Sequence, residues 1–295
     1  MMQALIFDPS LSIGLVPEPV PTPSQALVQV AAVSLNFGEV AYASPRPGYV
    51  SGWDASGVVV QAAADGTGPA VGARVVTFGW GGAWAQLRAV ETAELAVLPD
   101  GVEFGRASAL PVAGVTALQA VRRLGALLGR RVLITGSSGG VGRFAVQLAA
   151  RAGAHVIASA ARGEGLLDLG ASEVVAEPSL LRGRVYGVLD NVGGQQLADA
   201  FNLLEDDGVV QAIGKASREP TVIDFEEARV RSARGRIENF NVTTPFGDDL
   251  AYLAGLLESG SLDPQIGWRG PWSQASDAAS ELLARRVAGK VVLDL

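Results

Sequence analysis

Residues 132–142 read VLITGSSGGVG, an apolar run that breaks into glycines immediately before an amphipathic stretch. The run predicts a strand over residues 131–135, and apolar residues at 141, 145, 148 and 152 predict a following helix. Glycines let backbone approach a phosphate group without Cβ collisions, and the free N–H groups at a helix start attract its negative charge. The alternative interpretation is a tight loop of the kind found in any α/β protein.

The same succession of apolar strand, glycine turn and amphipathic helix continues beyond this stretch. It begins near Ala113 and predicts further strands over residues 155–159, 185–190 and 209–213. Alternation of strand and helix is typical of a parallel α/β sheet. The sequence therefore predicts the α/β fold class, with a doubly wound parallel sheet of the Rossmann type in this region.

The first third of the chain differs, because it is rich in Val, Gly and Pro and alternates over short segments. These segments predict a mostly antiparallel, barrel-like domain, with strands over residues 26–33, 56–62, 74–78 and 83–90. From Thr244 onward, a predicted helix over 248–258 and a predicted strand over 290–295 are assigned back to this domain. The predicted domains are residues 1–112 with 245–295, and residues 113–244.

Composition excludes several kinds of site and partner. The chain has 295 residues, no cysteine and one histidine, which excludes disulfides, thiolate zinc sites and iron–sulfur clusters and argues against a histidine-built metal site. Its net charge of -7, with no dense basic run, lacks the electrostatic pattern of a nucleic-acid binder. The start has no basic region typical of a secretory signal, and no apolar run approaches the roughly 20 residues of a membrane span. We expect a soluble, cytoplasmic protein that acts on small molecules.

The segment after the second predicted strand indicates which dinucleotide the glycine turn binds. Read strictly as G-x-G-x-x-G, the turn departs from the pattern, because Ser137 stands at its first glycine. NAD sites usually carry an acidic residue about 20 residues further on, whereas this chain has Ser159 and Arg162 in that segment. Arg162 can pair with a 2′-phosphate, and Ser159 can add a hydroxyl donor. NADPH is the predicted cofactor; the alternative is that Arg162 is a solvated surface residue.

These features together resemble a known family over essentially the whole chain. The matching segments are SLNF at 34–37, GWDASGVV at 52–59, LPVAGVTA at 110–117, GGVG at 139–142 and GKVVL at 289–293. The chain resembles the zinc-independent medium-chain dehydrogenases/reductases, in their quinone oxidoreductase and enoyl reductase branch. The resemblance implies a GroES-like catalytic domain formed by both chain ends, with an inserted Rossmann domain. It also implies a homodimer, in which an edge strand of the Rossmann sheet pairs across a two-fold axis.

The resemblance also indicates that no metal takes part. Relatives that oxidise alcohols hold a catalytic zinc ion at positions that fall here on Asn36, Trp53 and Val112, and none of these can serve as those ligands do. Without a metal to polarise a carbonyl, hydride transfer needs an acceptor that is already electrophilic. The predicted substrates are therefore a quinone or the C=C bond of an α,β-unsaturated carbonyl compound, and the sequence does not separate the two.

Three side chains are candidates for catalysis. The resemblance places Asn36 near the nicotinamide, where its amide could donate to developing negative charge; the alternative is a buried amide that ties two loops together. Tyr42 and Tyr49 are candidate proton donors to an enolate. Tyr42 is displaced by one position from the family pattern, and either tyrosine could instead be a wall residue. Trp53 is expected to fill the volume of the absent zinc site, with Trp80, Trp84, Trp268 and Trp272 as apolar walls or packing residues.

Residues that follow the predicted Rossmann strands are the candidates for cofactor binding, because carboxyl strand ends face the ligand crevice of such sheets. The predicted set is Thr116, Ser138, Gly139, Gly140, Val141, Gly142, Ser159, Arg162, Asn191, Val192, Gly214, Lys215, Phe240 and Asn241. A protein that binds NADPH without turnover, as a redox sensor or structural partner, is the alternative to an enzyme.

Overall fold

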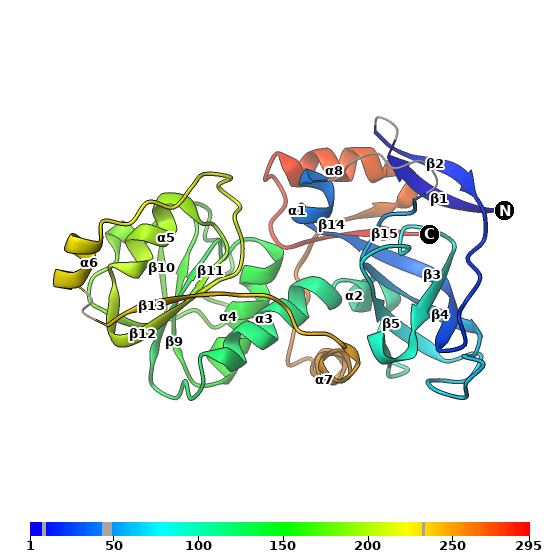
Figure 1. The fold of residues 1–295 in the computed structure, drawn as a ribbon, viewed down its shortest axis with the longest axis horizontal. Helices are drawn as coiled ribbons and strands as arrows, with labels where there is room; N and C mark the ends of the chain where they lie inside the picture. Colours follow the sequence, from blue (N-terminus) through cyan, green and yellow to red (C-terminus); the bar gives the residue numbers. More distant parts are fainter. Residues whose placement is uncertain (8–9, 43–48, 232–233) are drawn as a thin grey trace. The chain divides into compact units, whose positions relative to one another are not determined.

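The strand before the glycine turn lies inside a parallel sheet (Figure 1). The structure is a computed structural model that describes residues 1–7, 10–42, 49–231 and 234–295. In this described part, contacts divide the chain into unit 1, Met1–Val115 with Thr243–Leu295, and unit 2, Thr116–Val242. Unit 1 is mainly β-structure and unit 2 alternates strands and helices, which confirms the α/β fold class.

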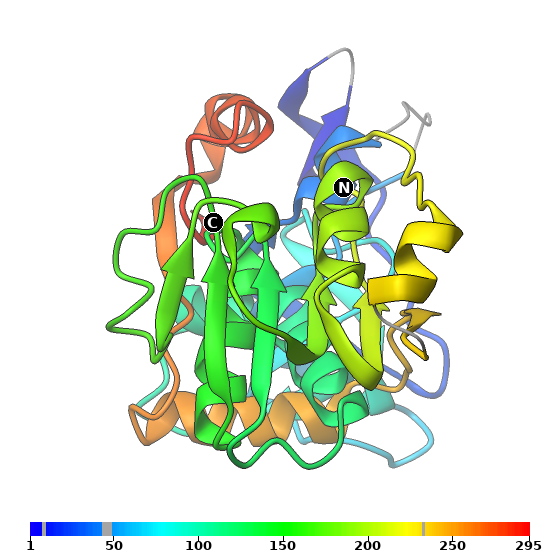
Figure 2. The same cartoon turned by 90° about the vertical axis from the view of Figure 1, so that its left-hand side faces the viewer.

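Unit 2 contains a six-stranded sheet in its described residues, ordered β10-β9-β8-β11-β12-β13. Every neighbouring pair in it is parallel, and Figure 2 shows the arrows pointing the same way. The carboxyl ends of the strands therefore meet at one edge of the sheet. The strands are β8 (Arg131–Thr135), β9 (His155–Ser159), β10 (Glu173–Val175), β11 (Val185–Asp190), β12 (Leu204–Ala212) and β13 (Arg236–Asn239).

Helices in unit 2 follow the strands, as the predicted alternation requires. Helix α4 (Gly140–Arg151) begins directly after the glycine turn, and residues 142–149 are all buried. The prediction of a single buried face needs two corrections. Almost the whole circumference of α4 is buried, so the buried surface is wider than predicted, and Ala152, which was placed on the predicted face, is exposed beyond the end of the helix. The other helices that reach into this unit are α3 (Pro111–Arg123), η2 (Pro178–Leu180), α5 (Gly194–Phe201) and α6 (Phe225–Arg231).

Unit 1 is built on a seven-stranded sheet in the described residues, with the path β14-β15-β3-β4-β5-β7 and β6 paired to β3. All its pairs are antiparallel except β14 with β15. A separate hairpin pairs β1 with β2. The strands are β1 (Met2–Phe7), β2 (Leu11–Val16), β3 (Gln25–Leu35), β4 (Asp54–Gln61), β5 (Arg74–Phe78), β6 (Leu87–Glu91), β7 (Leu95–Val97), β14 (Ile266–Pro271) and β15 (Lys290–Asp294).

The chain end returns to the first strands, as predicted. Strand β15 pairs antiparallel with β3, so that Val291 lies opposite Leu35. Buried apolar residues of both strands join one core cluster with Trp84 and helix α8. The helices of this unit are α1 (Phe37–Ala41), η1 (Thr92–Glu94), α2 (Phe104–Ser108), α7 (Gly247–Glu258), η3 (Trp272–Gln274) and α8 (Ala275–Leu283).

Two predicted segments need correction. The strand predicted over 83–90 is β6, Leu87–Glu91, because the residues before it turn: Ala85 makes only an isolated bridge to Ala4. The strand predicted over 209–213 begins earlier, at Leu204, and its first part is polar.

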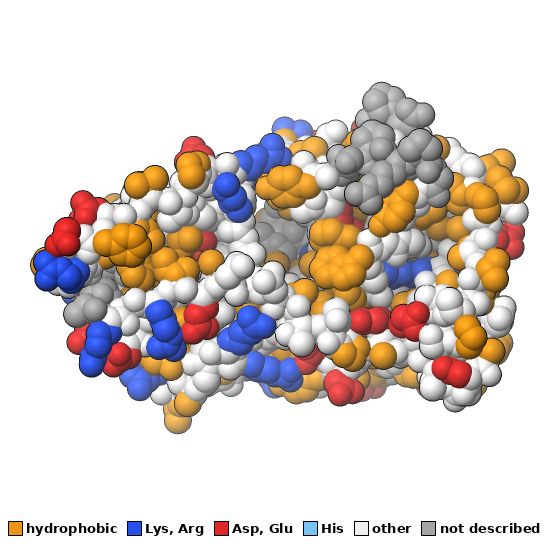
Figure 3. Space-filling model, viewed as in Figure 1, with side chains coloured by type: hydrophobic (Ala, Val, Ile, Leu, Met, Phe, Trp, Pro, Cys, Tyr) orange, Lys and Arg blue, Asp and Glu red, His pale blue; other side chains and the backbone are white. Residues whose placement is uncertain are grey.

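None of the helices in the described residues has the length and hydrophobicity that a bilayer crossing needs. On the face drawn in Figure 3, Lys and Arg side chains of unit 2 are interleaved with Asp and Glu.

Glycine at position 289 is required at the start of β15. Its φ is +90°, and a Cβ there would collide with the carbonyl oxygen of Gln265, which accepts the Lys290 N–H. We predict that Gly289→Ala lowers the free energy of unfolding by about 2–3 kcal/mol, because strain and collision add. Urea denaturation measures this. Gly101→Ala is the matched control, since a Cβ at Gly101 meets nothing within 4 Å and should change stability little. Equal effects of the two substitutions would contradict the prediction.

Candidate active site

A buried carboxylate joins three segments of unit 1. Asp54, the first residue of β4, is 0% exposed. Its Oδ1 accepts from the Val112 N–H at 3.1 Å, and its Oδ2 accepts from Ser34 Oγ at 2.8 Å and Asn36 Nδ2 at 2.8 Å. Lys290 Nζ, at the start of β15, lies 3.4 Å from the same Oδ2 and is also buried. Asp54 thus binds both backbone and a cation, and it fixes β3, β4 and β15 to one another.

The Asn36 side chain is held from both ends by this network. Its Oδ1 accepts from Lys290 Nζ at 2.6 Å, while Nδ2 donates to Glu39 Oε2 at 2.7 Å and to Asp54 Oδ2. An amide has two N–H donors, and here they are directed at one carboxyl oxygen of Glu39 and one of Asp54. The side chain therefore ties the end of β3 to its neighbours. Donation from Asn36 to a substrate would require one N–H to leave its carboxylate, and that role remains a prediction.

Glu39 is a buried acid in the first turn of α1. Its Oε2 also accepts from the Asn36 backbone N–H at 2.8 Å, and its Oε1 accepts from the Trp53 N–H. Burial is the largest influence on this carboxyl group, followed by the charge of Asp54; together they raise its pKa to about 8 against the effect of the Asn36 donors and Lys290. The Glu39 carboxyl group therefore releases its proton at a higher pH in the folded protein than in the unfolded chain.

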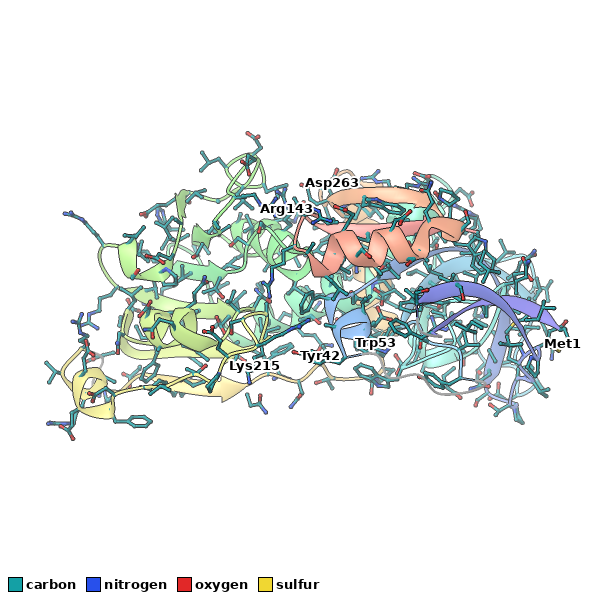
Figure 4. All side chains as sticks on the ribbon, turned by 90° about the horizontal axis from the view of Figure 1, so that it is seen from above. Met1, Tyr42, Trp53, Arg143, Lys215 and Asp263 are labelled. Atoms are coloured by element: carbon teal, nitrogen blue, oxygen red, sulfur yellow. The ribbon has the colours of Figure 1, made fainter. Side chains whose placement is uncertain are left out.

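The predicted tyrosines lie at the surface of unit 1. Tyr42 follows α1 as its C-cap residue and is 64% exposed. Figure 4 shows Tyr42 and Trp53 close to α1. Tyr49 is 43% exposed, and its Oη donates to the Trp80 carbonyl oxygen at 2.7 Å. Trp84 is core rather than wall, because it is 0% exposed, whereas Trp268 and Trp272 pack partly buried against the same cluster.

The glycine turn of unit 2 has the close packing that a phosphate loop needs. Gly136 has a φ of +61°, and a Cβ at Gly142 would collide with the Gly136 carbonyl oxygen and lie 2.6 Å from Ser137 Cα. Ser137 is buried, and its Oγ donates to the Ile134 carbonyl oxygen at 2.6 Å, which closes the turn. Helix α4 starts at Gly140, and the N–H groups of its first turn have no acceptor within the helix. Such groups are suited to an anion.

A second feature at the end of β9 fits a bound dinucleotide. Ser159 is 1% exposed, and its Oγ has no hydrogen-bond partner within the described part of the chain. A buried hydroxyl without a partner is unfavourable, and a bound ligand can supply the missing partner. Arg162 lies three residues further on and is exposed. The hydroxyl and the glycine turn are adjacent, because the Ser137 N–H donates to the Ser159 carbonyl oxygen at 3.1 Å.

The strand ends of β8 and β11 are joined by Asp190. Its Oδ1 accepts from Thr135 Oγ at 2.6 Å, and its Oδ2 accepts from the Gly193 N–H at 2.9 Å. Asn191 returns to Thr135 through Nδ2, which donates to the Thr135 carbonyl oxygen at 2.8 Å. Burial raises the pKa of Asp190. The predicted residues Asn191 and Val192 therefore lie in a loop fixed against the strand that carries the glycine turn.

Predicted residues after β12 and β13 reach the same edge of the sheet. The Gly214 N–H donates to the Asp190 carbonyl oxygen at 3.0 Å, and Lys215 is exposed beside it. Phe240 is buried under the Arg123 guanidinium, which lies 4.5 Å from the ring centroid and donates to the Asn241 carbonyl oxygen at 2.8 Å. Figure 4 labels Arg143, in α4, and Lys215 at one end of unit 2. Thr116 lies on α3 and is buried.

Known proteins match this chain in both of its units. An alcohol dehydrogenase GroES-like domain matches residues 22–100, and a zinc-binding dehydrogenase domain matches residues 167–293. Erythronolide synthase EryA2 of Saccharopolyspora erythraea is 34% identical over 94% of this chain, which spans 8% of that protein. NADPH-dependent alkenal/one oxidoreductase, chloroplastic, of Arabidopsis thaliana is 30% identical over 91% of this chain and 72% of its own length. The chain belongs to the medium-chain dehydrogenase/reductase family.

A solved structure supports the same branch. The quinone oxidoreductase from Coxiella burnetii has a TM-score of 0.82 and 26% identity, and the match covers 100% of this chain and 98% of that one. The chain is an oxidoreductase of the zinc-independent quinone and enoyl reductase branch of the family. Unit 1 is its GroES-like part and unit 2 its Rossmann part.

The name of the zinc-binding dehydrogenase domain that matches residues 167–293 does not fit the residues of this reductase. Within the described ranges, no group of three or more His, Cys, Asp or Glu side chains could hold a metal ion. At the three positions expected to correspond to zinc ligands stand Asn36, Trp53 and Val112. The buried Asp54 and Lys290 side chains fix the backbone and side chain around Asn36.

Sequence reasoning missed four charged residues of this reductase. Glu39 lies three residues after Asn36 in a capping-box pattern that could have identified it. Lys290 lay in the quoted GKVVL segment, but its partners are 236 to 255 residues away. Asp190 is the last residue of a predicted strand. A carboxylate at that place, beside the ligand crevice of such a sheet, could have identified it as a candidate site residue. Arg88 is buried in β6 and donates to the Trp53 carbonyl oxygen at 2.9 Å, but it has no local signal, because it lies in an ordinary alternating strand.

The raised pKa of Glu39 gives stability a defined pH dependence. Between about pH 4.5 and pH 8 the folded protein retains a proton that the unfolded chain releases, so the free energy of unfolding falls as pH rises through this interval. We predict that Glu39→Gln, which keeps an acceptor for the Asn36 N–H, removes a slope of up to about 1.4 kcal/mol per pH unit. Urea denaturation between pH 5 and pH 8 measures it. Equal slopes for wild type and variant would contradict the prediction.

Proposed function

We propose that the chain is an NADPH-dependent reductase that passes a hydride to a quinone or to the C=C bond of an α,β-unsaturated carbonyl compound. Its catalytic domain is residues 1–112 with 245–295, and its NADPH-binding domain is residues 113–244. The observation that carries the proposal is the buried Ser159 hydroxyl without a partner, directly beside the glycine turn. The substrate classes follow those of two proteins similar to it, an alkenal/one oxidoreductase and a quinone oxidoreductase.

Preference for NADPH is supported by the segment after β9. No acidic residue stands at residues 159–163, so nothing there repels a 2′-phosphate. Arg162 is exposed and can donate to a phosphate with charge-assisted hydrogen bonds, and Ser159 Oγ needs a partner. The first N–H groups of α4 would face the pyrophosphate, and the residues after β11, β12 and β13 would hold the ribose and nicotinamide. When bound, the dihydronicotinamide supplies a hydride.

The chain's own residues would orient the acceptor and complete proton transfer. An enone takes the hydride at its β-carbon and becomes an enolate, whereas a quinone and a hydride together give a quinol anion; either anion then needs a proton. Tyr42 is exposed and can donate through its phenol or through a water. Tyr49 and Asn36 would have to release existing hydrogen bonds, to the Trp80 carbonyl and to a carboxylate respectively. We propose Asn36, Tyr42 and Tyr49 as the catalytic set, with Tyr42 the most accessible donor.

The existing hydrogen bonds of Asn36 and Tyr49 favour one alternative, a protein without catalytic turnover. Both Asn36 N–H groups and the Tyr49 hydroxyl already have acceptors, which suits a protein that binds NADPH without turnover as a redox sensor or structural partner. We also propose a homodimer, because β13 is an edge strand and can pair with its copy. The compartment that we propose is the cytoplasm.

The direct test is the rate of NADPH oxidation with 1,4-naphthoquinone and, separately, with an α,β-unsaturated ketone. We predict acceptor-dependent turnover with NADPH at a kcat/KM at least tenfold above that with NADH. Saturable NADPH binding without turnover of either acceptor would instead favour the sensor. Equal use of the two dinucleotides would contradict the cofactor assignment.

Arg162 offers a sharper test of the cofactor. We predict that Arg162→Ala raises the KM for NADPH about tenfold or more and leaves that for NADH unchanged, because only the 2′-phosphate loses a charge-assisted partner. Arg229→Ala is the matched control, since Arg229 is an exposed arginine of α6 that pairs with Glu226. Equal losses for both dinucleotides, or none, would contradict the role of Arg162.

A further inference from the structure

Trp80 is a large aromatic side chain of unit 1 that is exposed to solvent. It is 58% exposed and lies between Gly79 and Gly81. Its ring meets Trp53 at 5.3 Å between centroids and 81° between planes, and Phe78 at 5.0 Å and 80°. Both arrangements are edge-to-face, which fixes the orientation of the indole. Figure 3 shows hydrophobic side chains gathered on the face of unit 1 that it draws.

A buried cation holds the loop that carries Trp80. Arg88 is 2% exposed, and its Nη2 donates to the carbonyl oxygens of Gly79 at 3.1 Å and Gly81 at 3.2 Å. Its Nη1 donates to Thr77 Oγ at 2.7 Å. Because the planar guanidinium has donors in fixed directions, it sets the path of the backbone on both sides of Trp80.

The glycines around Trp80 are fitted to this arrangement. A Cβ at Gly79 would lie 2.7 Å from Arg88 Nη2, and a Cβ at Gly81 would collide with Tyr49 Oη. The same Tyr49 hydroxyl donates to the Trp80 carbonyl oxygen. A glycine-rich loop would otherwise have high conformational freedom. Side chains from three segments therefore hold one exposed indole in place.

The loop is continuous with the buried network of the candidate active site. The Trp53 carbonyl oxygen accepts from Arg88 Nη2 at 2.9 Å, while the Trp53 N–H donates to Glu39. The Trp53 ring also lies 3.6 Å from the position of a Cβ at Gly38, two residues after Asn36. The two indoles thus extend from the Asn36 region to the surface.

We propose that Trp80 and Trp53 form an aromatic wall that selects flat, fused-ring acceptors over small acyclic ones, and that Arg88 is the positioning residue for this wall. The inference rests on the proposed reductase function and specifies the acceptor of that same site. A two-ring quinone can lie against an indole over its whole area, whereas an acyclic enone covers only a part of it. The selection acts through binding, so it changes KM for the flat acceptor more than kcat.

The first experiment replaces Trp80 and compares two acceptors, 1,4-naphthoquinone and methyl vinyl ketone, at saturating NADPH. Trp80→Ala is expected to raise KM for naphthoquinone about tenfold and to change that for methyl vinyl ketone less than twofold, while Trp80→Phe retains most of the preference. Phe225→Ala, which removes an exposed aromatic side chain of α6, should alter neither KM. Equal changes for both acceptors, or no change for either, would overturn the proposal.

The second variant tests the positioning role. Arg88→Lys keeps a buried cation but loses the planar fork, so it is expected to raise KM for naphthoquinone as Trp80→Ala does, with kcat for methyl vinyl ketone retained. Combined with Trp80→Ala, it should add little further loss, because both act on one wall. Independent, multiplicative losses would overturn this role. If Arg88→Lys does not fold, the Trp80 variants still decide the proposal.

Direct binding separates this inference from the proposed function. Naphthoquinone is titrated without NADPH, and the quenching of tryptophan fluorescence is followed. Saturable quenching whose amplitude Trp80→Phe lowers, because one of the two indoles of the wall is gone, and Trp268→Phe leaves unchanged would support the wall even in a protein that shows no turnover. Quenching that is the same in wild type and Trp80→Phe would overturn the wall even in an active reductase.

Discussion

The buried contact between Asp54 and Lys290 is the constraint on which unit 1 depends. The two side chains are 0% and 2% exposed, and removing charges from water is costly unless every donor and acceptor is satisfied. Here Ser34, Asn36 and the Val112 N–H complete the carboxylate, and the Leu35 carbonyl and Asn36 Oδ1 complete the ammonium. The starts of β4 and β15 are thereby fixed to the end of β3. The candidate catalytic residue Asn36 is placed by this contact rather than by a metal.

A second pair of buried ionisable side chains, Glu39 and Arg88, extends that constraint to the surface. Glu39 accepts from the Trp53 N–H, and Arg88 donates to the Trp53 carbonyl oxygen, so the backbone of Trp53 is held on both sides of its Cα. Arg88 has its pKa lowered to about 10 by burial and remains a cation at neutral pH. In unit 2, Asp190 has a similar function, because it joins the strand of the glycine turn to the loop after β11. In both units, buried polar groups fix the loops that carry candidate site residues.

The sequence predicted the parts of the fold that depend on local pattern. The strands over 131–135, 155–159 and 185–190 were predicted with the bounds that the structure has, because each is a short apolar run beside glycine or polar residues. Strand β13 was missed, since its four residues include only one apolar side chain, Ile237. The glycine turn and Asn36 came from spacing and family resemblance. The buried charged clusters could not be predicted from the sequence, because Arg88 and Lys290 are buried against partners that lie far away along the chain.

The most direct test is a double-mutant cycle on Asp54 and Lys290, with the free energy of unfolding measured by urea denaturation. Asp54→Asn and Lys290→Met should each destabilise the protein by about 3–5 kcal/mol, because each leaves the other charge buried and unpaired. The double variant should lose less than the sum of the two by at least about 1 kcal/mol. Strictly additive losses would contradict the account, since the two groups would then stabilise unit 1 independently of each other.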